Sequence, residues 1–335
     1  MKWGIIGCGH IALKRFSPAL SLVPGARLVA VQNRSMEKAA RLAQQLGVAR
    51  YYDNAEELLA DPEVEVVYIA SPTVSHLPET LAAARAGKHV LCEKPMAMNT
   101  AEARVMLEAC DEAGVKLMLA NMMRFHACHR EARRLFREGA IGRLVAARVD
   151  FCFLLDTRRS QWRLEKAIGG GGPVMDVGIH AIDLLRYVTG SEVASVQAMT
   201  QGWAVNTTVG GDAEDTAVAN LLFRDGCLAN ITVSFSTPDS LNRLELYGSE
   251  GMLWTEGTIG QESTGKLFVR RNGTVEEYSP VPADIYAAEI AHLEECIREG
   301  RQPLIDGTEG MHDLAVAGAI YQSARTGCTV TIQES

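Results

Sequence analysis

The first 120 residues alternate short apolar runs with longer amphipathic runs. Apolar runs rich in β-branched residues predict strands, and apolar residues recurring every three or four positions predict helices. Their alternation is typical of a parallel sheet covered by helices. The predicted strands are 3–6, 27–31, 50–52, 64–70, 89–92 and 116–120, and the predicted helices are 11–22, 36–46, 55–59, 77–86 and 101–113.

Glycine and proline mark the ends of these helices. Gly47, Gly87 and Gly114 each follow a predicted helix, where glycine readily adopts the left-handed conformation of a C-terminal cap. Pro18 lies inside the first predicted helix, and proline has no N–H to donate to the preceding turn. We therefore expect the first helix to be kinked or to start late.

The pattern changes after Asn121. A helix is predicted over 127–138, and the alternation that follows predicts strands with one wet face and antiparallel pairing. The Asp-Gly of 224–226 predicts a hairpin between 218–223 and 227–233. Further predicted strands are 144–151, 193–199, 243–247, 251–255 and 266–270, and the closing helices are 283–299 and 308–326.

Length and composition limit the classes of protein. A chain of 335 residues exceeds what one core usually organises, so we predict two domains, 1–120 and 121–335. No apolar run reaches the roughly 18 residues that span a bilayer, and no signal-peptide pattern opens the chain, so we expect neither a membrane protein nor secretion. A net charge of −8 without a basic stripe disfavours nucleic-acid binding.

The eight cysteines are scattered and form no CxxC pair. This distribution is typical of reduced thiols in a cytoplasmic protein. The densest group of possible metal ligands is His126-Ala127-Cys128-His129, which lacks the two-plus-two spacing of a structural zinc site. We predict no metal, and we expect this group to lie at the surface.

A dinucleotide motif opens the chain. Gly7-Cys8-Gly9-His10-Ile11-Ala12 matches G-x-G-x-x-A directly after a predicted strand and before a predicted helix. The first glycine permits a tight turn, the second lets pyrophosphate approach bare backbone, and the alanine keeps helix and strand close. We predict cofactor contacts from Gly7, Gly9, His10, Ile11 and Ala12. The alternative is a glycine-rich turn without a ligand.

The end of the second strand bears on the choice of cofactor. Selectivity for NAD usually uses a carboxylate there, whereas this chain reads Asn33-Arg34-Ser35 after Gln32. A guanidinium and a hydroxyl suit a 2′-phosphate, so we predict that NADP(H) is preferred over NAD(H). Alternatively Arg34 is merely solvated and Asn33 contacts the ribose of NAD.

Two further segments complete a family pattern. Leu91-Cys92-Glu93-Lys94-Pro95 follows the fifth predicted strand, and Gly169–Gly172 leads into Asp176-Val177-Gly178-Ile179-His180. With the N-terminal motif, these resemble the Gfo/Idh/MocA oxidoreductases over essentially the whole chain. Gln161-Trp162-Arg163 and the missing acid at Asn33 are most similar to the branch of 1,5-anhydrofructose reductase and dihydrodiol dehydrogenase.

The resemblance implies an α/β fold, with a Rossmann domain followed by an α/β domain whose large open sheet is predominantly antiparallel and commonly supports dimers or tetramers. It implies hydride transfer between nicotinamide and a carbon bearing a hydroxyl or carbonyl, with Lys94, Asp176 and His180 as the catalytic set. It also implies cofactor contacts from a loop similar to the family's Thr-Pro-Asn-x-x-His and from nearby residues, namely Ser71, Pro72, Thr73, His76, Glu93, Lys94 and Asn121.

Hydride transfer to a ketone needs a positioned acid, and the reverse reaction needs a base. Lys94 and His180 are the candidates, and Asp176 lies one helical turn before His180, where each can orient the other. The structural alternatives are a lysine paired with Glu93, a helix N-terminal acid and an ordinary buried histidine.

Three further residues are candidate substrate contacts. Trp162 and Arg163 offer a flat apolar face and a fork of donors that suit a sugar or cyclic diol, although Trp162 can equally belong to the core. Arg124 follows the last Rossmann strand, where it contacts substrate or bridges the domains.

The leading hypothesis is an NADP-preferring dehydrogenase or reductase acting on a sugar, cyclitol or dihydrodiol-like compound. One alternative is a redox-neutral elimination or glycoside cleavage in which the nicotinamide is regenerated in each cycle. Another is a non-catalytic regulator that senses dinucleotides, which has no use for the combination of Lys94, Asp176 and His180.

Overall fold

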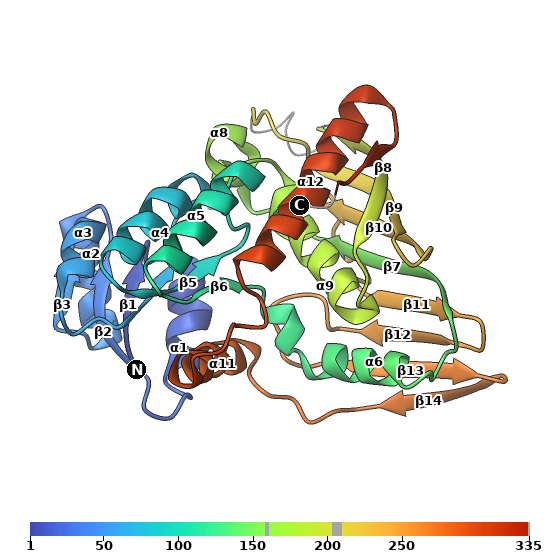
Figure 1. Ribbon diagram of the computed structural model, residues 1–335, viewed down its shortest axis with the longest axis horizontal. Coiled ribbons are helices and arrows are strands. Elements are labelled where there is room, and N and C mark those ends of the chain that lie inside the picture. The colour runs from blue at the N-terminus through green and yellow to red at the C-terminus, as the bar shows by residue number, and fades with distance from the viewer. Residues whose placement is uncertain (158–160, 203–209, 334–335) are drawn as a thin grey trace. The chain divides into compact units, whose positions relative to one another are not determined.

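The computed structural model describes residues 1–157, 161–202 and 210–333, and the chain forms two compact units (Figure 1). The first unit is Met1–Met122 with Tyr286–Met311, and the second is Met123–Ile285 with His312–Ser335. The segment 286–311 thus joins the first unit, although in the sequence it lies between the two segments of the second. The Leu119 N–H donates to the Ile305 carbonyl at 2.8 Å, and Trp3 Nε1 donates to Glu294 at 2.9 Å.

The first unit contains a parallel sheet of six strands in the order β3-β2-β1-β4-β5-β6, which confirms the predicted Rossmann arrangement. All four residues of Val66–Ile69 are buried, as expected for a sheet covered on both faces. The strands are β1 Lys2–Ile6, β2 Arg27–Gln32, β3 Arg50–Tyr52, β4 Val66–Ile69, β5 His89–Glu93 and β6 Leu117–Ala120. The helices are α2 Met36–Leu46, α3 Ala55–Ala60, α4 His76–Arg85, α5 Thr100–Glu112 and α11 Ile285–Glu299, with a short helix η2 Thr73–Ser75.

The first helix is irregular, but in a different way from the kink or late start expected from Pro18. It begins as a π-helix, η1 Ala12–Phe16, and continues as α1 Ser17–Leu20, with proline in the first turn. Phe16 stacks on Tyr68 with ring centroids 4.0 Å apart, and its other neighbour Trp3 meets it edge-on at 5.4 Å. This aromatic cluster fixes the helix against β1 and β4.

The second unit contains a mixed sheet of nine strands in the order β14-β13-β12-β11-β7-β10-β9-β8-β15. The predicted hairpin is confirmed, because β9 and β10 pair antiparallel. Its second strand also pairs with β7 in parallel, an exception to the predicted antiparallel pattern. The strands are β7 Leu144–Cys152, β8 Val193–Gln201, β9 Thr216–Phe223, β10 Leu228–Ser234, β11 Leu244–Gly248, β12 Met252–Glu256, β13 Lys266–Arg271, β14 Thr274–Tyr278 and β15 Val330–Thr331.

Helices cover one face of this sheet. Along β9, Ala217, Ala219 and Leu221 are buried whereas Val218 and Leu222 are exposed, so the strand has one covered and one open face. The helices of this unit are α6 Ala127–Arg137, α8 Lys166–Gly169, η5 Val174–Gly178, α9 Ile179–Thr189 and α12 Gly307–Thr326 from residue 312 onward, with short helices η3 Met122–Phe125 and η4 Gln161–Leu164.

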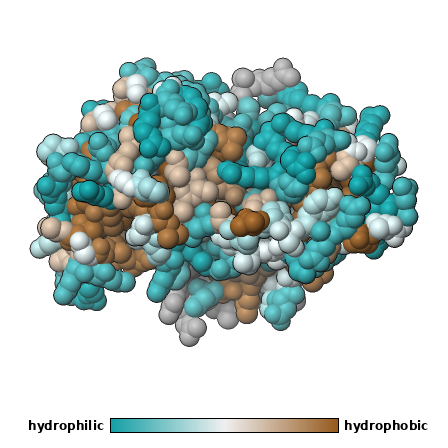
Figure 2. Space-filling model, turned by 90° about the horizontal axis from the view of Figure 1, so that it is seen from below, coloured by the Kyte–Doolittle hydropathy of each residue, from teal (hydrophilic) through white to brown (hydrophobic). Residues whose placement is uncertain are grey.

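The surface mixes hydrophilic residues with patches of apolar ones, as Figure 2 shows for one face. In the part of the chain that the structure describes, no helix is both long and apolar enough to cross a membrane.

The predicted surface position of the group 126–129 is wrong. His126, Cys128 and His129 are all buried, because this segment starts α6 and packs into the second unit. The His129 ring lies 2.9 Å from both the Met123 carbonyl and the Thr258 hydroxyl, and burial lowers the pKa of His129 to about 3. The group is therefore a neutral, hydrogen-bonded part of the core.

Candidate active site

The dinucleotide motif forms the tight turn that the sequence predicts. Gly7 has a φ of +75°, and a Cβ at this position would lie 2.5 Å from the backbone nitrogen of Ser71. The turns after β1 and β4 therefore meet at a point where only glycine fits. At Gly9 an added Cβ would find only the Gly7 carbonyl, at 3.8 Å, so the backbone there is open to a ligand. Ala12 is fully buried, as expected for close packing of the helix on the strand.

Gln32, at the end of β2, ties this turn to its neighbour. Its Oε1 accepts from the Gly7 N–H at 3.2 Å, and its Nε2 donates to the Asp53 carbonyl at 3.0 Å. The side chain is 5% exposed. Gln32 thus fixes the position of the Gly7 backbone at the end of the sheet. The sequence motif alone does not predict this role.

The residues after Gln32 have local partners. Ser35 is the N-cap of α2, with its hydroxyl accepting from the Lys38 N–H at 3.4 Å, and its own N–H donates to Asn33 Oδ1 at 3.2 Å. Arg34 between them is exposed. Their contacts with a cofactor stay predictions.

The loop after β4 carries a buried acid that the sequence analysis did not single out. The Ser71 hydroxyl hydrogen-bonds to Glu79 of α4. Burial raises the pKa of Glu79 to about 7, although the bond from Ser71 and the charge of Arg34 act in the opposite direction. Glu79 thus ionises near neutral pH within reach of the charge of Arg34.

His76 bridges two loops. Its Nδ1 lies 2.9 Å from the Pro95 carbonyl and its Nε2 lies 3.0 Å from the Ser71 carbonyl. The side chain is 1% exposed, and burial lowers its pKa. His76 therefore holds the loop after β4 against the loop that carries Lys94.

Lys94 follows β5 and is half-buried. The carboxylate of the preceding Glu93 accepts from the Lys94 backbone N–H at 3.3 Å, and its other oxygen accepts from the Tyr68 hydroxyl. Glu93 thus anchors the backbone at the base of the lysine. Asn121, after β6, is fully buried.

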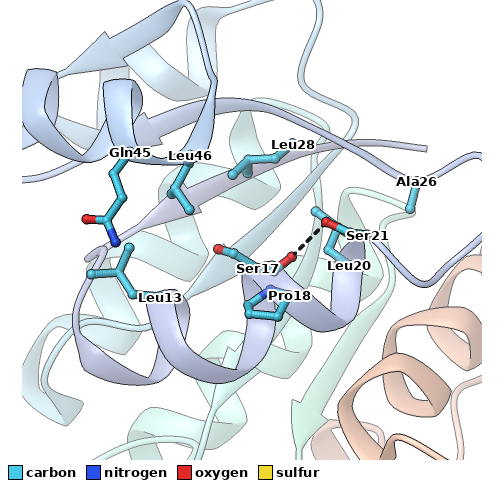
Figure 3. Close-up of a pocket in the computed structure, with 9 residues that line it drawn as sticks. All are labelled: Leu13, Ser17, Pro18, Leu20, Ser21, Ala26, Leu28, Gln45 and Leu46. Carbon is cyan, nitrogen blue, oxygen red and sulfur yellow. Dashed lines mark hydrogen bonds between the residues drawn. The ribbon is translucent and has the colours of Figure 1, made fainter.

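A pocket of about 300 Å³ in the first unit is separate from these residues (Figure 3). It lies between α1, β2 and the end of α2. The Ser17 hydroxyl donates to the Ala12 carbonyl at 2.8 Å, and the Ser21 hydroxyl donates to the Ser17 carbonyl at 3.2 Å. Its lining is Leu13, Ser17, Pro18, Leu20, Ser21, Ala26, Leu28, Gln45 and Leu46, so none of the predicted site residues contributes to it.

In the second unit, Asp176 and His180 lie on one continuous helical stretch that starts as the π-helix η5 and becomes α9. The sequence predicts an ordinary α-helical turn here, whereas the wider π-turn changes the angle about the helix axis between two residues four apart. His180 is 3% exposed, and its ring centroid lies 6.2 Å from that of Phe151 on β7. Such π-segments are frequent at functional sites.

Arg163 and Asp176, two predicted site residues, form an ion pair. Arg163 NH1 lies 3.3 Å from Asp176 Oδ2, with the side chains 30% and 12% exposed. The guanidinium also lies over the Trp162 ring, 5.5 Å from its centroid. The structure thus brings Trp162, Arg163 and Asp176 together in a partly exposed cluster.

Arg124 has a structural partner. Its guanidinium donates to Asp183 Oδ1 at 2.6 and 2.8 Å and lies 5.3 Å from the centre of the Tyr187 ring. The residue is 4% exposed. This ion pair favours a role in packing α9, and a contact between Arg124 and substrate stays a prediction.

Comparison with known proteins decides the family. Residues 1–121 match the model of an oxidoreductase family with an NAD-binding Rossmann fold, and residues 129–254 match the GFO/IDH/MocA C-terminal domain. The 1,5-anhydro-D-fructose reductase of Ensifer adhaerens is 34% identical, over 99% of this chain and 98% of its own. The chain belongs to the Gfo/Idh/MocA oxidoreductase family.

Further members of this family are similar over their whole length. The mouse trans-1,2-dihydrobenzene-1,2-diol dehydrogenase is 30% identical over 100% of this chain and 98% of its own. The crystal structure of the aldose-aldose oxidoreductase from Caulobacter crescentus, complexed with glycerol, has a TM-score of 0.92 and 34% identity, covering 99% of each chain. The predicted family resemblance is therefore confirmed.

The Gfo/Idh/MocA motifs identify residues that follow strands or start helices. They do not identify the distant residues that hydrogen-bond to the backbone of these motifs. Gln32 and Glu214 are examples, because each contacts a motif from at least 25 residues away in the sequence. For Glu214, the sequence gives only indirect evidence that such a residue is needed. A helix preceded by Gly-Gly-Pro has no side-chain acceptor in those residues, so its first N–H groups bond to water, to a ligand or to a residue distant in the sequence.

Proposed function

We propose that this oxidoreductase transfers a hydride between NADP(H) and a hydroxyl- or carbonyl-bearing carbon of a sugar, cyclitol or dihydrodiol-like compound. The observation that carries the proposal is the placement of Gly7, Ser71 and Lys94 after three neighbouring parallel strands, β1, β4 and β5. Ligands of such sheets bind outside the carboxyl ends of the strands. The names of the relatives, which include a sugar reductase and a diol dehydrogenase, support the substrate class.

The open backbone at Gly9 fits a dinucleotide. We propose that the pyrophosphate lies against residues 7–12, where Gly9 leaves space that a side chain would fill. The backbone of Ser71, Pro72 and Thr73 would contact the same cofactor. Glu93 and His76 have their polar atoms engaged within the unit, so they support the site chiefly by holding Lys94 and Ser71. When bound, the nicotinamide supplies or accepts the hydride.

In this proposal a side chain of the protein, Lys94, donates and accepts the proton. In the reducing direction, the Lys94 ammonium gives a proton to the carbonyl oxygen as the carbon receives the hydride, and in the oxidising direction the amine takes it back. Asp176 and His180 would bind hydroxyl groups of the substrate and hold them for this exchange. Arg163 and Trp162 would contact the substrate through guanidinium donors and a flat ring face.

The preference for NADP(H) is proposed to rest on Arg34. The described end of β2 offers no carboxylate to the ribose, and Arg34 is exposed there. We expect Arg34→Ala to lower kcat/KM for NADP(H) about 10- to 100-fold, the equivalent of one or two charge-assisted hydrogen bonds, while the value for NAD(H) changes little. Steady-state kinetics with both cofactors measures this.

Arg41→Ala is the matched control, because Arg41 is an exposed arginine on the following helix that pairs with Glu37. An NADP preference that is the same in Arg34→Ala as in the wild type would remove Arg34 from cofactor selection.

The general experiment is a screen of sugars, inositols and dihydrodiols with both cofactors, read by the absorbance of reduced nicotinamide. A dehydrogenase changes this absorbance continuously with a suitable substrate. A redox-neutral eliminase would consume substrate without net change, and a sensor would bind cofactor without turnover. Either of these results would refute the proposed reaction.

We propose that the open face of the nine-stranded sheet pairs with a second copy of the chain. Tyr247, Ala146, Leu228 and Leu222 are register partners across β11, β7, β10 and β9, so their side chains form one row. Three of them are large apolar residues that are 38%, 59% and 40% exposed. A contiguous apolar patch of this kind marks an interaction surface.

Leu228→Glu places a charge in the middle of this row, and we expect it to shift a dimeric or larger wild-type species towards monomer. Sedimentation velocity measures the shift. Leu22→Glu is the control, because Leu22 is 62% exposed and belongs to the first unit, so it is not part of the nine-stranded sheet. A wild-type protein that sediments as a monomer would refute the pairing.

A cytoplasmic location is also proposed, supported by the cysteines. All eight are free, and seven of them are buried.

A further inference from the structure

The helical stretch that carries Asp176 and His180 starts without a cap of its own. It follows Gly171, Gly172 and Pro173, and the N-cap Pro173 makes no side-chain hydrogen bond. The first N–H groups of a helix have no partner within the helix, and glycine and proline offer no side-chain acceptor. The buried N–H groups of Gly172 and Val174 therefore need an acceptor from elsewhere in the chain.

Glu214 supplies that acceptor. Its Oε1 lies 3.1 Å from the backbone nitrogens of both Gly172 and Val174, and each N–H donates to it. The Tyr321 hydroxyl donates to the same oxygen at 2.8 Å. The residue is 7% exposed, so these bonds are made out of contact with water. One carboxylate oxygen thus joins the start of η5, the segment before β9 and helix α12.

Close packing around this contact leaves no space for a side chain at Gly171 or Gly172. A Cβ on Gly172 would lie 1.9 Å from the Glu214 carbonyl oxygen, and a Cβ on Gly171 would lie 1.9 Å from the Tyr321 hydroxyl. No side chain fits at either position without moving the backbone of Glu214 or the ring of Tyr321. The glycine run is therefore a packed contact surface, whereas its sequence suggests only a turn.

The same segment also holds the element that carries Arg163. The Lys166 N–H donates to Asp212 Oδ1 at 2.8 Å, and the N–H groups of Asp212 and Ala213 donate to the Leu164 carbonyl at 3.0 and 3.1 Å. Residues 212–214 therefore contact both the Trp162–Arg163 turn and the start of the Asp176–His180 stretch. The Arg163–Asp176 ion pair joins the two elements directly.

We propose that Glu214 is a positioning residue that fixes Asp176 and His180 relative to Arg163 by accepting the N–H groups of Gly172 and Val174. The proposal rests on the proposed function for the roles of Asp176, His180 and Arg163. The role of Glu214 is geometric, because the length of its side chain places the acceptor oxygen where it binds both N–H groups at the start of the helix. Displacing a catalytic group by about 1 Å can cost on the order of 100-fold in rate.

Burial raises the pKa of Glu214, which disfavours its charged form. The hydrogen bonds from Tyr321, Val174 and Gly172 act on this pKa in the opposite direction. A neutral acceptor of the same length therefore tests whether the acceptor oxygen or the charge matters.

Two substitutions separate the effect of the side-chain length of Glu214 from the effect of its charge. Glu214→Gln keeps an acceptor oxygen at the same distance and removes the charge, so we expect kcat within about threefold of wild type and an unshifted pH profile. Glu214→Asp keeps the charge but is one methylene shorter, so it cannot serve both N–H groups, and we expect kcat about 10- to 100-fold lower. The dissociation constant for NADP(H), which binds the first unit, should change in neither. The reverse order of kcat, or equal kcat in both variants, would overturn the proposal.

A readout independent of turnover is hydrogen–deuterium exchange followed by mass spectrometry. Glu214→Asp should speed amide exchange within 172–180 and leave the Rossmann strands unchanged. Tyr321→Phe, which removes only the hydroxyl, should produce a smaller increase in the same segment and takes its place if Glu214→Asp does not fold. Unaltered exchange in 172–180 would overturn the proposal. Wild-type protein that turns over no substrate would refute the proposed function alone, because the exchange experiment still tests the contact.

Discussion

Lys94→Ala is expected to lower kcat by about 10²- to 10⁴-fold, the range typical for loss of a general acid or base. Binding of NADP(H) should persist, because the turn at Gly7 is held by Gln32 and packs against the backbone of Ser71, and neither contact involves the lysine side chain. Single-turnover absorbance measurements give the hydride-transfer rate, and calorimetry gives cofactor affinity.

A second variant separates proton exchange from charge. Lys94→Arg keeps a positive charge, but a guanidinium does not release its proton in proteins. We expect it to be nearly as slow as Lys94→Ala. Lys116→Ala, at the start of β6, is the control. A Lys94→Ala enzyme with near wild-type kcat would eliminate the lysine from the mechanism, and full activity in Lys94→Arg would reduce its role to charge alone.

Arg186→Met is expected to destabilise the protein by about 3–5 kcal/mol, because it removes one partner of a buried ion pair, Arg186–Asp313, in which both side chains are 1% exposed. Arg186 lies on α9 and is 3% exposed. It donates to Asp313 at 2.8 Å, to Glu192 at 2.6 and 2.8 Å, and to His312 Nδ1 at 2.9 Å. Burial raises the pKa of Asp313, with the nearby charge of Asp183 adding to the effect. Without the Arg186 guanidinium, the buried carboxylates of Asp313 and Asp183 lose a positive charge that offsets their mutual repulsion.

Urea unfolding of both proteins measures the difference in free energy of unfolding. Arg134→Met is the matched control, because Arg134 pairs with Glu131 and Glu138 but its side chain is 50% exposed. Exposed pairs contribute about 0–1 kcal/mol, so the control should be nearly neutral. Equal destabilisation by the two substitutions would contradict the assignment of Arg186 to a buried ion pair with Asp313.

The parts of the fold set by local chemistry were predictable from the sequence. Helix α2 begins and ends where expected, at Met36 and Leu46, because Ser35 caps its start and Gly47 ends it with a φ of +67°. Pro18 predicted a kinked or late-starting first helix, whereas the structure has a π-helical segment before the proline. This π-helical segment includes Phe16, which stacks on Tyr68 of β4, a contact between distant residues that no local pattern reveals.

Other parts depend on contacts that are distant in the sequence. Strand β14 was missed because its first four residues are exposed and show no apolar alternation, as suits the edge of a sheet. The parallel pairing of β7 with β10 joins residues about 80 positions apart, such as Ala147 and Ala229. Hydrophobic pattern identifies strands but does not select such partners.

The same division applies to the site. The predicted site residues follow strands or start helices, so their positions in the fold could be predicted. The residues that hold them, such as Gln32 and Glu214, are ordinary polar residues in the sequence. Only the fold shows that each has its acceptor oxygen on the backbone N–H of a glycine that belongs to a motif.

The central claim is that hydride moves between the nicotinamide and a carbon of a small polyhydroxy substrate. The most direct test uses NADPH with deuterium at the transferring position of the nicotinamide, together with carbonyl substrates chosen from the screen, and mass spectrometry of the product. We predict an alcohol that carries one deuterium on the newly reduced carbon. Product formed without deuterium, for either face of the nicotinamide, would contradict the account.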